Sequence, residues 1–183
     1  MATPPRAYLA TIRTIDKITT VVGYCVAALI VPLVLANTIE VFMRYFLRQP
    51  TSWATDVTVM AYATLFMLGA AFALLKGAHV RTDMLWDRFS DRKKGMIDSI
   101  AFIVFFFPTM IILFFLSFDD FLYSYEMDER STLASWQPII WPLRAVVPLT
   151  ALLLTLQGVS EVLKSLWAAR TGEALVHHEK VEI

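Results

Sequence analysis

The sequence has little of what disulfide-rich, redox and nucleic-acid-binding proteins depend on. It contains one cysteine, Cys25, which excludes a disulfide framework and any metal or iron–sulfur site built from several cysteines. Only 17% of its 183 residues are charged, against about 25% in soluble domains. The 16 basic and 16 acidic residues balance, which removes the electrostatic argument for nucleic-acid binding. Apolar residues make up 57% of the chain, and this composition indicates an integral membrane protein.

Four apolar stretches are each long enough to cross a bilayer, which needs about 20 helical residues. Because backbone groups in lipid must be satisfied within their own segment, the spans are expected to be helices. We therefore predict an all-α membrane protein with one domain, 1–183. Its spans are expected at about 18–43, 53–76, 97–122 and 139–165, with tails 1–17 and 166–183. The first apolar run is longer than that of a signal peptide, so we expect it to be retained.

Lysine and arginine are distributed unequally between the two sides of this arrangement. Most lie in the tails and in the connection between the second and third spans. The other side carries Arg44, Arg48, Arg130 and Arg144. Because basic residues are retained on the cytoplasmic side, both termini and the central connection are predicted to be cytoplasmic.

The central connection carries an amphipathic pattern. On a helix, Asp83, Asp87 and Asp91 would form one stripe, with Leu85, Trp86 and Phe89 on the opposite half. The pattern predicts a short interfacial helix, and an irregular solvated loop is the alternative. Residues expected to anchor the chain at the interface are Trp86, Trp136, Trp141 and Arg144.

Chemistry-bearing residues are scarce within the spans. The three histidines, His79, His177 and His178, lie outside them, so no axial haem ligand is available there. The sequence also has no glycine-rich phosphate loop. We therefore predict that the chain is not an enzyme and binds no cofactor or metal.

Ionisable residues near the membrane lie close to the ends of the spans. They are Glu40, Arg44, Asp56, Asp98, Arg144 and Glu161. Glu40 and Arg44 are four residues apart, in the order that favours an ion pair on one helix face. Asp56 falls in the expected first turn of the second span, where a carboxylate suits the helix dipole. Each residue thus has a structural explanation, and none indicates a transport path.

Two further patterns concern packing. The third span is rich in phenylalanine beyond what four helices need among themselves, so part of it must face lipid or a partner. In the second span, Gly69, Ala70, Ala71 and Ala73 would allow another helix to approach closely.

An ordered set of residues between Asn37 and Asp83 resembles a known family. Arg44-Tyr45 ends the first span, Trp53 and Asp56 open the second, Gly69-Ala70-Ala71 follows, and the set ends in the segment from Lys76 to Asp83 that contains His79. This order is similar to that of the small, DctQ-like membrane subunit of tripartite ATP-independent periplasmic (TRAP) transporters. Thr55 stands where members often have an acidic residue.

The resemblance implies a division of labour in the inner membrane of a bacterium. A periplasmic binding protein would capture an organic anion, typically a carboxylate. A large membrane subunit would bind sodium and import the anion, and this chain would pack against that subunit in the bilayer. The resemblance assigns a structural and docking role to Arg44, Trp53, Asp56, Gly69, His79 and Asp83. Arg44 and Asp56 would bridge the first two spans, and His79 and Asp83 would hydrogen-bond at the cytoplasmic interface.

Two other functions are compatible with four membrane helices. One is a stand-alone dimeric exporter with Glu40 as its proton site, and the other is a membrane enzyme or electron-transfer subunit. The exporter would transport as a purified chain and lose activity on Glu40→Gln. A haem or flavin absorption spectrum would reveal the electron-transfer subunit.

Overall fold

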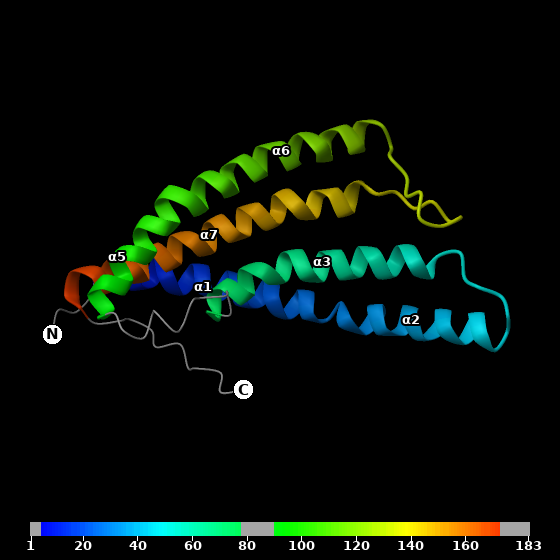
Figure 1. Cartoon of the computed structure of the whole chain (residues 1–183), viewed down its shortest axis with the longest axis horizontal. Coiled ribbons are helices and arrows are strands. Elements are labelled where there is room, and N and C mark those ends of the chain that lie inside the picture. Colours follow the sequence, from blue (N-terminus) through cyan, green and yellow to red (C-terminus); the bar gives the residue numbers. More distant parts are fainter. Residues whose placement is uncertain (1–4, 78–89, 173–183) are drawn as a thin grey trace.

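The computed structural model describes residues 5–77 and 90–172, and these form a bundle of long helices (Figure 1). Four stretches are long and apolar enough to cross a membrane, which confirms the predicted all-α membrane architecture. The helices are α1 (Arg6–Ala27), α2 (Ile30–Tyr45), α3 (Ala54–Leu75), α5 (Asp91–Ala101), α6 (Phe107–Glu126) and α7 (Trp141–Thr171), with a π-helical turn, η1 (Phe102–Phe106), joining α5 to α6.

Helix α7 is the centre of the bundle. It packs against α6, α5, α3 and α1, whereas α2 packs mainly on α3. In Figure 1, α6, α7, α3 and α2 follow one another in a row, and the start of α1 lies near the end of α7. The connections 46–53 and 127–140 lie together at the opposite end. The described helices thus have the even number of crossings that the predicted topology requires.

Two prolines mark the places where the long helices depart from regular geometry. Pro32 has no N–H for the carbonyl of Ala28, which instead accepts a bond from the N–H of Val31 at 3.1 Å, and α1 gives way to α2 at this point. Before Pro108, the N–H of Phe107 bonds to the carbonyl of Phe102, five residues back. The wider π turn makes room for the proline ring in the third span.

One close helix crossing is made by a glycine that the sequence pattern does not single out. A Cβ atom on Gly95 of α5 would lie 2.4 Å from the carbonyl oxygen of Ser165 in α7. By contrast, a Cβ atom on Gly69 would meet nothing within 4 Å. Gly69 therefore has no close helix neighbour among the described residues, and its docking role stays a prediction. Ala71 of the same stretch is buried in the core beside Leu74 and Leu153.

The helices extend further than the predicted spans at the end that holds the start of α1. Helix α1 begins at Arg6, inside the segment 1–17 that the sequence assigns to a tail. At about 1.5 Å per residue, α3 is about 33 Å long and matches the hydrocarbon layer, while α1, α5 and α7 continue beyond its end. The predicted interfacial helix falls mostly on 78–89, outside the described residues.

Candidate functional site

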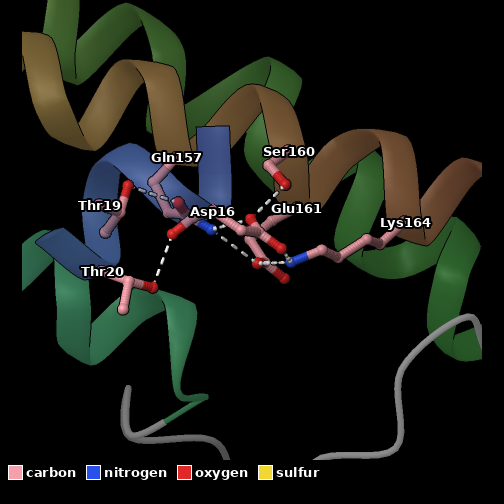
Figure 2. Close-up of polar contacts among 7 residues, drawn as sticks. All are labelled: Asp16, Thr19, Thr20, Gln157, Ser160, Glu161 and Lys164. Atoms are coloured by element: carbon pink, nitrogen blue, oxygen red, sulfur yellow. Dashed lines mark hydrogen bonds and ion pairs between the residues drawn. The ribbon is translucent and has the colours of Figure 1, made fainter. Parts of the chain in front are cut away.

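A cluster of polar side chains joins the first and last long helices. Figure 2 shows Asp16 of α1 lying against three residues of α7: Gln157, Ser160 and Lys164. The Asp16 carboxylate accepts hydrogen bonds from Ser160 Oγ at 2.7 Å and from Gln157 Nε2 at 3.1 Å. It also pairs with Lys164 Nζ at 3.0 Å. The cluster fastens α1 to α7 with directional bonds.

The charge of this cluster is not balanced by the residues that form it. Lys164 also pairs with Glu161 at 2.8 Å, so one ammonium group serves two carboxylates. Gln157 supports both carboxylates, since its amide nitrogen lies 3.1 Å from Glu161 Oε1 as well. Thr19 completes the arrangement by donating to Gln157 Oε1 at 2.8 Å. Gln157 and Ser160 are fully buried, and Lys164 is 8% exposed. Removing any partner of such a buried charge is destabilising, because the charge is then left uncompensated away from water.

Sequence reasoning missed most of this cluster. The sequence pattern places Asp16 in a tail and Glu161 near the end of a span, and it gives no role to Lys164. A signal was present, because Gln157, Ser160, Glu161 and Lys164 recur at spacings of three and four residues. That spacing places them on one helix face, and it indicates a polar partner on another helix.

At the opposite end of the bundle, Glu40 ties α2 to the connection that follows it. Its carboxylate accepts a bond from Arg44 Nε at 2.9 Å, which confirms the predicted pair on one helix face. It also accepts a bond from the backbone N–H of Thr51 at 2.9 Å and another from the Thr51 hydroxyl. Both carboxylate oxygens are therefore used within this chain.

Asp56 has a different partner from the one that the sequence suggested. It is 1% exposed, and its Oδ1 accepts a hydrogen bond from the hydroxyl of Ser131 at 2.5 Å. Arg44 pairs with Glu40 instead, so the predicted bridge between Arg44 and Asp56 is not formed. The reason is proximity, because Glu40 lies one helical turn from Arg44 on the same helix. Asp56 instead fixes the connection between α6 and α7.

Arg144 holds the end of α6 and the start of α7 together. Its guanidinium contacts Asp120 of α6 at 2.5 Å and Glu129 at 2.7 Å. The neighbouring Trp141 packs in the same region, its ring centroid 5.5 Å from that of Tyr125 in an edge-on contact. The structure thus gives two of the predicted interfacial anchors partners within the chain.

The described residues offer no evident centre for metal chemistry. Among residues 5–77 and 90–172, no group of three or more His, Cys, Asp or Glu side chains lies close enough together to hold a metal ion. What these clusters can do is join helices and loops at both ends of the bundle.

Comparison with known families is decisive for identity. Residues 33–167 match the model of the DctQ component of tripartite ATP-independent periplasmic transporters. The chain belongs to this family. No curated protein and no solved structure matches it. The resemblance drawn from the sequence is thereby confirmed.

Membership of the DctQ family fixes the broad role. The family is a transporter component and not an enzyme family. It functions in TRAP transporters with a large membrane subunit and a periplasmic binding protein. The chain is therefore a membrane protein of the small permease type.

The other residues predicted for docking or for anchoring this DctQ component differ in how far the structure buries them. Trp53 immediately precedes α3 and is half-buried, whereas Gly69 is open on the outside of α3. Trp136, predicted as an interfacial anchor, is 50% exposed. His79, Asp83 and Trp86 lie outside the described residues.

Proposed function

We propose that this DctQ component is the accessory subunit of a sodium-driven TRAP transporter in a bacterial inner membrane. It packs against the large membrane subunit and supports it, while that subunit imports an organic anion of the carboxylate class. The observation that carries the proposal is the pairing of charges within this chain. Glu40, Arg144 and Lys164 are ion-paired near the ends of the spans, and long stretches between the ends have no charge.

The coupling ions are assigned to the large subunit. A coupling site needs ionisable or polar ligands at membrane depth, and such residues are costly there unless they are used. In this chain, residues 18–39 and 57–75 contain no charged side chain. The distribution of lysine and arginine supports cytoplasmic termini, with the connections 46–53 and 127–140 facing the periplasm.

The geometry at Glu40 argues against the stand-alone exporter. A proton site must be free to change its protonation and its partner during transport. The Glu40 carboxylate instead bonds to Arg44 and to Thr51, and its side chain is 13% exposed. This is the geometry of a fixed tie between a helix and a loop.

Reconstitution tests the proposal. The chain is expressed with the large membrane subunit and the binding protein, purified in mild detergent and placed in vesicles with a sodium gradient. We expect the large subunit to co-purify at equal stoichiometry, and carboxylate uptake to fall to background when this chain is omitted. Recovery of the chain as a homodimer that transports alone, with activity abolished by Glu40→Gln, would establish the exporter instead.

A further inference from the structure

The face of α2 that points away from the bundle carries a polar group, and lipid chains offer that group no hydrogen-bond partner. Asn37 is exposed, and its Nδ2 donates one hydrogen bond to the carbonyl of Leu33 at 2.9 Å. An asparagine amide has a second N–H and an acceptor oxygen, and neither has a further hydrogen bond among the described residues. Thr38 differs, because its hydroxyl is satisfied by the carbonyl of Val34.

Asn37 lies within the apolar layer rather than at its edge. It precedes Arg44 by seven residues, so it is about 10 Å along the helix from the ion-paired outer end. Apart from Thr38 and the inward-facing Glu40, its neighbours from Ile30 to Met43 are apolar. A polar group that faces hydrocarbon without a partner costs about 1–3 kcal/mol on protein scales. Asn37 therefore indicates a contact with protein.

The residues in line with Asn37 have the spacing of a helix-packing seam. Ile30, Val34, Asn37, Val41 and Arg44 follow one another at intervals of four, three, four and three residues. This is the repeat that keeps one stripe facing a partner helix in left-handed packing. The stripe is made of short or β-branched side chains up to Arg44, and Val34 and Val41 are 51% and 54% exposed.

A second exposed stripe on α2 provides the contrast. It contains Val31, Leu35, Thr38 and Phe42, and the Phe42 ring stacks on that of Phe46 at 5.0 Å. This stripe has no unsatisfied amide, and its one aromatic side chain, Phe42, is suited to lipid. The third span likewise exposes large apolar rings, with Phe105 71% exposed.

We propose that the stripe Ile30, Val34, Asn37, Val41 and Arg44 is the surface on which a transmembrane helix of the large membrane subunit packs. Asn37 hydrogen-bonds to a polar side chain or a free carbonyl of that helix. Lipid chains have no such group, and the membrane partner of this family is the large subunit. Asparagine is one of the residues that link membrane helices in this way. The inference rests on the proposed function.

Site-specific photo-crosslinking in the co-expressed complex tests this surface. A photo-reactive amino acid is placed at position 34, 37 or 41, and for comparison at 31, 35 or 42. We expect adducts with the large subunit from the first set and few from the second. Adducts at twice the mass of this chain, adducts mainly from the second set, or no protein adduct would each overturn the inference. If the large subunit still co-purifies in any of these three cases, the proposed function stands. Failure to co-purify would overturn both.

A substitution pair measures what Asn37 contributes. Asn37→Leu keeps the side-chain volume and removes the hydrogen-bonding groups, while Leu35→Ala on the second stripe is the control. From the strength of such bonds between membrane helices, we expect Asn37→Leu to weaken retention of the large subunit about three- to tenfold, with Leu35→Ala near wild type. Equal retention by both variants would show that the amide makes no contact with the partner.

Discussion

Replacement of Lys164 by methionine is the sharpest test of the cluster between α1 and α7. Methionine keeps much of the apolar stem, so the change removes mainly the ammonium group. That group lies 2.8 Å from Glu161 and 3.0 Å from Asp16. Its loss leaves two carboxylates close to the same Gln157 amide with no cation between them.

The expected cost follows from burial. Removing one partner of a buried ion pair costs about 3–5 kcal/mol, because the remaining charge is uncompensated. Glu161 is 6% exposed at its side chain and cannot recover hydration, whereas Asp16 is 25% exposed and recovers part of it. We therefore expect Lys164→Met to lower the free energy of unfolding by about 3 kcal/mol, the lower end of that range.

The assay is equilibrium unfolding of the purified chain in mixed micelles, followed by helical circular dichroism. Lys17→Met is the matched control, since Lys17 is an exposed lysine of α1 near the same end of the bundle. We expect it to change the free energy of unfolding by less than about 0.5 kcal/mol.

A rescue variant separates charge from packing. Adding Asp16→Asn and Glu161→Gln to Lys164→Met removes both orphaned charges but keeps most of the shape and several hydrogen-bonding groups. Replacing every member of a buried ionic group by an uncharged residue often changes stability little. We therefore expect the free energy of unfolding to return to within about 1 kcal/mol of wild type. The reasoning is refuted if Lys164→Met is as stable as Lys17→Met, or if the triple variant is no better than the single one.

Two further predictions concern other contacts. Gly95→Ala should lower the free energy of unfolding by about 1–3 kcal/mol, because the added Cβ would collide with the backbone of Ser165, while Gly69→Ala should be neutral or stabilising. The same unfolding assay compares the two variants, and equal effects would contradict the close approach at Gly95. Arg144→Gln should speed hydrogen exchange at the end of α6 and the start of α7, because one guanidinium joins Asp120 and Glu129, whereas replacing the more exposed Arg130 by glutamine should not. Unchanged exchange in both variants would show that the Arg144 ion pairs contribute little.

The spans were predictable because their signal is strong and local. A run of about 20 apolar residues has few structural alternatives, and the ion pair of Glu40 with Arg44 follows from helical spacing alone. The helix ends were less predictable. Segment 6–17 is polar enough to suggest a tail, yet it forms the first half of α1 because Asp16 pairs with Lys164 of α7. Composition cannot show a partner that is more than 140 residues away in the sequence.

The candidate site was predicted only in part for the same reason. Asp56 was correctly placed in the first turn of its helix, but its contact with Ser131 depends on how the connection 127–140 folds back. The close crossing at Gly95 depends on which face of α5 meets α7, and sequence periodicity does not determine that. The family, by contrast, was recognisable because its motif is an ordered set of residues along one segment.

The cluster between α1 and α7 also constrains when the protein can complete its fold during synthesis. Asp16 leaves the ribosome before its partner Lys164, which lies 148 residues later in the sequence. Until α7 has been synthesised, the Asp16 carboxylate of α1 lacks the Lys164 ammonium group that pairs with it. Docking of α1 on α7 is therefore a late event, even though α1 can pack on α3 earlier. A nascent chain that stops before Gln157 exposes the segment of α1 that α7 would otherwise cover.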